Sequence, residues 1–117
     1  MANFTSDSQH KLYDSNIDVV ANTVTASGIV DDFENHYIGV RYYSDAVGTP
    51  VAPTAGTVTV EVLDEATNQW TAATGSPLTA SAITSKATYT GNITAVRATG
   101  SGVLTATHYQ VFDSANL

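Results

Sequence analysis

Apolar and polar residues alternate with a period of two along most of the chain, which predicts strands. In residues 57–64, TVTVEVLD, three valines point one way while two threonines and a glutamate point the other, as in a central core strand. Residues 36–43 alternate in the same way, with one set made up of His36, Ile38, Val40 and Tyr42 and the other of Tyr37, Gly39, Arg41 and Tyr43. We expect the first set to face the core and the second to face outward.

The alternation of apolar and polar residues changes phase in the middle of residues 17–26, IDVVANTVTA. Ile17 and Val19 share one face, whereas Val24 and Ala26 lie on the other. A phase change around Asn22 predicts either a bulge or a strand that crosses between two sheets.

The stretch 88–112 predicts a long hairpin near the C-terminus. Two runs rich in Thr, Val, Ile and Tyr flank Gly100-Ser101, and a Gly-Ser pair in that setting is typical of a type II′ turn. With a two-residue turn, Ala98 would face Val103 across the ladder.

About seven short strands with turn residues between them, and no helical periodicity, predict an all-β antiparallel sandwich. The pattern leaves Ig-like and jelly-roll topologies open. We assign residues 17–117 to this domain. Residues 1–16 show neither periodicity, and their isolated apolar residues Phe4, Leu12 and Tyr13 favour an extended N-terminal arm that docks on a neighbour over one that frays.

The amino-acid composition and net charge argue against several classes of function. The 117-residue chain has no cysteine, which excludes disulfides and thiolate metal sites. Its net charge of −7 disfavours nucleic acid and anionic membranes as partners. No signal-peptide pattern and no apolar run long enough to span a membrane occurs, so we expect a soluble protein made in a cytoplasm.

Motifs for catalysis or metal binding are missing. The acidic stretch 31–36 holds Asp31, Asp32, Glu34 and His36, but its spacing matches no known cage, so we interpret it as a solvated loop. There is no GxSxG, no GxxxxGK[ST] and no HExxH. We therefore expect no enzyme and no cofactor.

Aromatic residues indicate one candidate binding surface and one core position. Arg41 shares its face with Tyr37 and Tyr43, and an Arg flanked by aromatics forms a sticky amphipathic patch for a partner. The single tryptophan, Trp70, is expected to cover the end of the core beside Val62, because a lone Trp in a small β domain is usually a core residue.

The run YTGNITAVRATGSGVLTATHYQV, residues 89–111, resembles segments of small structural proteins of tailed bacteriophages. This family includes head decoration (cement) proteins and neck or tail accessory proteins. The resemblance implies a virion component assembled in the host cytoplasm, commonly a homotrimer whose arms reach over neighbouring major-capsid subunits. It implies anchoring through Phe4, Leu12 and Tyr13, with Tyr37, Arg41 and Tyr43 as a second surface.

Two alternatives stay open. The chain could be a neck, tail or baseplate protein of the virion, which would be present in about a dozen copies rather than hundreds. It could also be a carbohydrate-binding sandwich module, with Trp70 or the Tyr37–Tyr43 face stacked on sugar rings.

Overall fold

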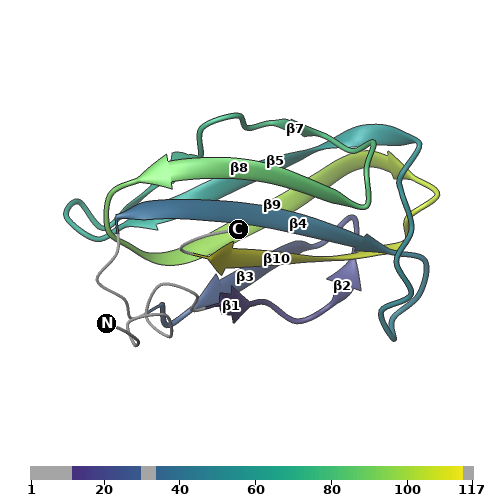
Figure 1. Ribbon diagram of the computed structural model, residues 1–117, viewed down its shortest axis with the longest axis horizontal. Helices are drawn as coiled ribbons and strands as arrows, with labels where there is room; N and C mark the ends of the chain where they lie inside the picture. Colours follow the sequence, from purple (N-terminus) through teal and green to yellow (C-terminus); the bar gives the residue numbers. More distant parts are fainter. Residues whose placement is uncertain (1–11, 30–33, 115–117) are drawn as a thin grey trace, which may run out of the picture.

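The computed structural model describes residues 12–29 and 34–114, and its strands form two layers (Figure 1). The strands are β1 (Leu12–Asp14), β2 (Asp18–Val19), β3 (Thr23–Ser27), β4 (Asn35–Tyr43), β5 (Ala55–Asp64), β6 (Gln69–Ala72), β7 (Leu78–Thr79), β8 (Thr84–Thr90), β9 (Ile93–Leu104) and β10 (His108–Ser114). The first sheet has the order β1-β10-β4-β8, with β2 also on β10; the second has the order β3-β9-β5-β6, with β7 also on β5. The predicted antiparallel β-sandwich is confirmed. None of the described residues forms a helix that could cross a membrane.

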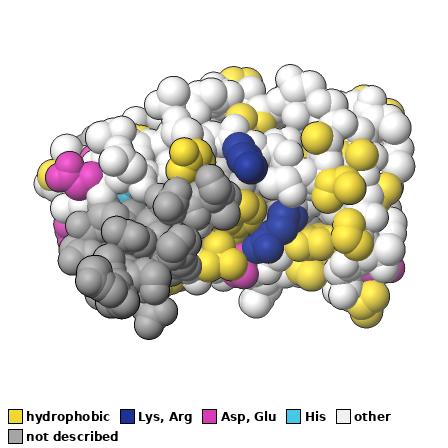
Figure 2. Space-filling view, viewed as in Figure 1, with side chains coloured by type: hydrophobic (Ala, Val, Ile, Leu, Met, Phe, Trp, Pro, Cys, Tyr) yellow, Lys and Arg dark blue, Asp and Glu magenta, His cyan; other side chains and the backbone are white. Residues whose placement is uncertain are grey.

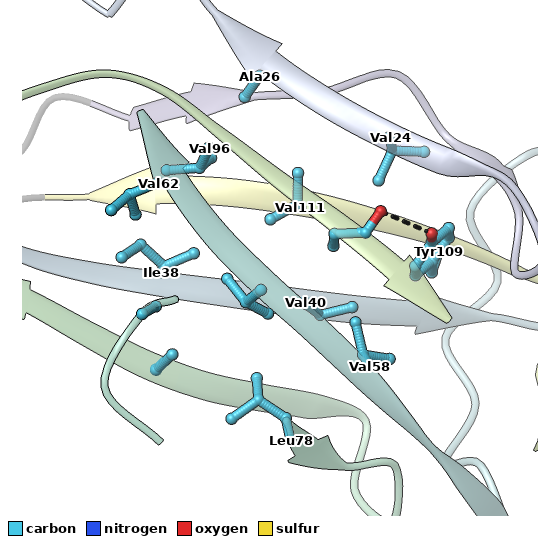
Figure 3. Packing of buried hydrophobic residues seen from close by; sticks show 14 of the residues in the cluster. Val24, Ala26, Ile38, Val40, Val58, Val62, Leu78, Val96, Tyr109 and Val111 are labelled. Carbon is cyan, nitrogen blue, oxygen red and sulfur yellow. Dashed lines mark hydrogen bonds between the residues drawn. The ribbon is translucent and has the colours of Figure 1, made fainter. Parts of the chain in front are cut away.

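The core lies between the two sheets and is built from the inward residues of each strand. Val58, Val60 and Val62 of β5 have no exposed surface, and neither do Ile38 and Val40 of β4. Figure 3 shows valines of β5 and β9 facing side chains of β4 and β10 across this layer. The alternation predicted for residues 36–43 and 57–64 is therefore confirmed.

Two tyrosines link the sheets by polar contacts. The buried hydroxyl of Tyr109 on β10 donates to the backbone oxygen of Ala98 on β9 at 3.0 Å (Figure 3). Burial raises the pKa of Tyr109 to about 12. At the molecular surface, Tyr89 of β8 donates to Asp64 Oδ2 of β5 at 2.7 Å, and this hydrogen bond lowers the pKa of Asp64. Both contacts fix how the layers are aligned.

The phase change around Asn22 marks a crossing between sheets. β2 pairs with β10 in the first sheet, whereas β3 pairs with β9 in the second. Of the two readings that the sequence left open, the crossing strand is the one that forms.

The predicted hairpin of residues 88–112 is wrong. β9 runs through Gly100-Ser101 without turning and pairs with β3 and β5, while β10 belongs to the opposite sheet. Gly100 is needed for a different reason: a Cβ there would lie 2.3 Å from the carbonyl oxygen of Val20. The glycine thus allows a close approach of another backbone segment, which is the second common use of a strand glycine.

The boundary of the predicted arm is also corrected. Leu12–Asp14 forms β1, the edge strand beside β10, with Tyr13 opposite Asp113. Ser15 is buried, and its backbone N–H donates to the carbonyl oxygen of Val111 at 2.9 Å. These residues belong to the sandwich because their backbone groups complete the sheet edge. The first eleven residues of the predicted arm, Phe4 among them, lie outside the described residues.

Candidate binding surfaces

The outer face of the first sheet gathers most of the chemistry predicted from the sequence. Strand register places Asp14, Phe112, Gly39 and Lys86 in one row across β1, β10, β4 and β8. Because alternate residues share a face, the neighbouring rows contribute Leu12, Tyr37 and Arg41. We call the surface formed by Leu12, Asp14, Tyr37, Arg41, Lys86 and Phe112 the Arg41 face. Figure 2 views the molecule from this side and shows two Lys/Arg side chains close together with hydrophobic side chains around them.

Arg41 is held in place by two contacts. Its guanidinium carbon lies 4.5 Å from the centroid of the Phe112 ring, a cation–π distance. Its Nη2 forms an ion pair with Asp14 Oδ1. About a third of each side chain, 31% for Arg41 and 36% for Asp14, is exposed. The buried Arg41 Nε has no hydrogen-bond partner among the described residues. The guanidinium group is thus oriented by its neighbours and partly exposed.

Gly39 makes this arrangement possible. A Cβ at Gly39 would lie 2.1 Å from Cζ and 2.2 Å from Cε2 of Phe112, its cross-strand partner. The Phe112 ring thus fills the space that a side chain at position 39 would occupy. Phe112 is only 4% exposed although it lies on the outer face, since the ring packs flat on the glycine beneath Arg41.

The predicted site residues separate into three groups. Tyr37 and Arg41 are half-buried on the Arg41 face, and Leu12 is 49% exposed there. Tyr43 points to the same side but is buried, and its hydroxyl donates to Gln110 Oε1 at 2.9 Å. Tyr13 points inward and packs against the core. Arg41 therefore stacks on Phe112, not on the tyrosines that flank it in sequence.

The outer face of the second sheet holds a second aromatic and charged cluster that the sequence reading missed. Trp70 of β6 is half-buried and pairs with Leu63 of β5, so it lies outside the core. The guanidinium carbon of Arg97 lies 4.1 Å from the centroid of the Trp70 ring. Arg97 Nε donates to Glu61 Oε1 at 2.8 Å. The prediction that Trp70 covers the end of the core is wrong, because an edge strand leaves the outer side of its residues uncovered.

Exposed threonines continue this surface. Thr23, Thr99 and Thr59 are aligned across β3, β9 and β5, and Thr25 lies beside Arg97. The hydroxyl oxygens of Thr23 and Thr99 are 2.8 Å apart. We call the surface formed by Thr25, Thr59, Glu61, Trp70, Arg97 and Thr99 the Trp70 face.

A buried polar pair lies inside the sandwich. His36 Nδ1 and Asp113 Oδ1 are 2.8 Å apart, and neither side chain has exposed surface. Asp113 Oδ2 has no hydrogen-bond partner among the described residues. The pattern had placed His36 on the core side of its strand, but its carboxylate partner, 77 residues away, could not be read from the sequence.

In residues 12–29 and 34–114, no three His, Asp or Glu side chains lie close enough to hold a metal ion. Asp31 and Asp32 of the acidic stretch lie outside the described residues. A shallow hollow of about 150 Å³ is lined by Asn16, Asp18, Thr23, Val24 and Thr25. One oxygen of Asp18 already accepts from the backbone of Val19 at 2.7 Å and from Asn22 at 3.1 Å.

Comparisons with known proteins identify a family and a distant structural likeness. A family model described as "Domain of unknown function (DUF7265)" matches residues 8–117. No curated protein sequence matches the chain. A solved structure of the Clostridium thermocellum endo-1,4-beta-D-xylanase 10B CBM22-1-GH10 modules, complexed with xylohexaose, has 14% sequence identity and a TM-score of 0.38. The match covers 88% of this chain and 25% of that chain, and at this score it carries no argument about function.

Proposed function

Because the chain belongs to the DUF7265 family, whose description names no activity, we propose its function from the geometry of its surfaces. It is a non-enzymatic structural protein of a tailed-phage particle, a decoration (cement) protein that binds the major capsid protein and stabilises the shell. The observation that carries the proposal is the Arg41 face, on which a partly exposed guanidinium is held over Phe112 beside Tyr37 and Leu12.

The composition of the Arg41 face is suited to contact with protein. Arg and aromatic residues are enriched at protein interfaces and supply most of their hot spots. Asp14 and Phe112 fix the Arg41 side chain before any partner arrives, so binding would immobilise little additional side-chain freedom.

The distribution of charge indicates which face of the protein would bind the shell. The described part of the chain has three Lys or Arg residues, and two of them, Arg41 and Lys86, lie on the Arg41 face. The chain as a whole carries a net charge of −7. This face would therefore turn toward an acidic patch on the shell, while the acidic remainder keeps decorated particles apart.

The resemblance of residues 89–111 to phage structural proteins supports the choice of a virion over other assemblies. This segment runs from the end of β8 through β9 into β10 and so contributes to both sheets. The resemblance therefore concerns the scaffold itself. On this proposal the protein assembles in the host cytoplasm, acts as a homotrimer, and uses Leu12 and Phe4 as further anchors, whereas Tyr13 serves the fold.

Cosedimentation with capsids tests the proposal. Capsids of the phage that encodes the chain, prepared without it, should bind the purified protein saturably, at hundreds of copies per particle. Two matched variants separate the faces, because Arg41 and Arg97 are each stacked on an aromatic ring and paired with a carboxylate. Arg41→Gln should weaken capsid binding by about tenfold or more, whereas Arg97→Gln should leave it unchanged.

Three results would contradict this assignment. If the wild-type protein does not cosediment, the capsid role is wrong. If both variants bind equally well, the Arg41 face is not the docking surface. Saturation at about a dozen copies would move the protein to the neck or tail, where rings of that size occur. Light scattering of the free protein should give the mass of a trimer.

A further inference from the structure

The Trp70 face is built on the outer side of the second sheet, opposite the Arg41 face. Trp70 lies on β6, Glu61 on β5 and Arg97 on β9, so three neighbouring strands contribute to one cluster. The Arg97 guanidinium carbon lies 4.1 Å from the centroid of the Trp70 ring and so covers one face of it. The Arg97 and Glu61 side chains are 34% and 32% exposed, respectively. They form an ion pair in which Arg97 Nε lies 2.8 Å from Glu61 Oε1. A strand-borne cluster of this kind is positioned more exactly than one on loops.

Hydroxyl groups extend the platform beside the charged pair. Thr25 lies opposite Arg97, and Thr59 lies opposite Thr99, two residues further along β5 and β9 from Glu61 and Arg97. All three threonines are exposed. Since neighbouring strands lie about 4.8 Å apart, these groups form a patch of donors and acceptors around the Arg97–Glu61 pair.

This combination matches the chemistry of a sugar chain. A pyranose ring has an apolar C–H face that packs on an aromatic ring and a rim of hydroxyls that hydrogen-bond to Arg, carboxylate and Thr. Arg97 and Glu61 cancel each other's charge, and the net charge of −7 would repel acidic polysaccharides, so the glycan should be neutral.

We propose that the Trp70 face is a binding site for neutral glycan chains, with the Trp70 ring face that Arg97 does not cover as the stacking platform and with Arg97, Glu61 and the threonines as hydroxyl partners. The site does not depend on the docking proposed for the Arg41 face. The two are compatible, because a protein held through its first sheet leaves the outer face of the second one open.

The single tryptophan makes a direct test possible. The purified full chain is titrated with cellohexaose, xylohexaose and N-acetylchitohexaose while Trp emission is recorded. At least one sugar should produce a saturable shift in emission. Calorimetry with the same sugar should show that Trp70→Ala loses about tenfold or more in affinity, that Trp70→Phe retains most of it, and that Arg97→Gln is weakened.

Arg41→Gln is the matched control and should bind the sugar as tightly as the wild type. Circular dichroism verifies that each variant is folded. If Trp70→Ala is not folded, the Arg97→Gln variant still tests the site. Failure to see a saturable shift with any of the three sugars overturns the proposal, as does binding that survives both Trp70→Ala and Arg97→Gln. A shift produced only by added capsids also overturns it, because Trp70 would then be a protein contact.

Discussion

Replacement of Gly39 by alanine tests how the Arg41 face is built. The new methyl carbon would lie 2.1 Å from Cζ and 2.2 Å from Cε2 of Phe112, far inside van der Waals contact. Moving the backbone would disturb pairing on both sides of β4, so the ring has to rotate away. Arg41, stacked at 4.5 Å on that ring, would lose its support.

The expected loss of stability follows from these contacts. Phe112 is 4% exposed, and re-exposing much of such a side chain costs about 1.5–3 kcal/mol. Loss of the Arg41 stacking adds about 0.5–1 kcal/mol at a partly exposed site. Alanine is favoured over glycine in a strand by about 0.5–1 kcal/mol, which offsets part of the loss. We therefore expect Gly39→Ala to lower the free energy of unfolding by about 1–3 kcal/mol, the usual range for overpacking.

Urea unfolding of four proteins measures the effect: wild type, Gly39→Ala, Phe112→Ala and the double variant. Without the Phe112 ring nothing obstructs the new methyl group, so Gly39→Ala should become neutral or stabilise the Phe112→Ala protein by about 0.5–1 kcal/mol. The disappearance or reversal of the destabilisation in the Phe112→Ala background is the diagnostic result. If Gly39→Ala destabilised both backgrounds equally, the cause would not be the ring, and the account of this face would be refuted.

Two further predictions concern buried polar groups. His36→Ala should lower stability by about 3–5 kcal/mol, because Asp113 would keep a buried carboxylate without its histidine; in urea unfolding, the double variant with leucine at both positions should lose much less, and an equal or larger loss would contradict this. Burial holds the pKa of Tyr109 at about 12 in the folded state, above its ordinary value of 10, so the folded protein keeps a proton that the unfolded chain releases. Stability should therefore fall as the pH rises from 10 to 12, and Tyr109→Phe should flatten that fall in a series of urea titrations; a parallel fall in the variant would contradict this assignment.

Period-two alternation predicted much of the fold because burial on one face determines it. The valines of β5 and the inward residues of β4 were assigned correctly from local pattern alone. The role of Gly100 was assigned incorrectly, because a glycine among strand residues can mark either a turn or a close approach of another segment. Only the position of Val20, 80 residues earlier in the chain, distinguishes the two. Local pattern contains no information on that contact.

The candidate surfaces show the same limit. The sequence identified Arg41 and placed it on an outward face, yet its aromatic and acidic partners, Phe112 and Asp14, come from β10 and β1. Trp70 was assigned to the core from the usual behaviour of tryptophan, whereas pairing with β5 at the sheet edge leaves it outside. Contacts across strands depend on register and strand order, which alternation does not encode.

The position of β10 determines when the first sheet can form during protein synthesis. β1, β2 and β4 all pair with β10, and Leu12 is opposite Ser114. At about 5–20 residues per second, a ribosome needs roughly 5–20 s to add the hundred or so residues between these partners. During that interval β4 has only β8 to pair with, and β1 and β2 have no partner in their sheet. Completion of the sandwich must therefore wait until β10 has left the ribosome, and nascent chains halted before that point would present unpaired strands to one another.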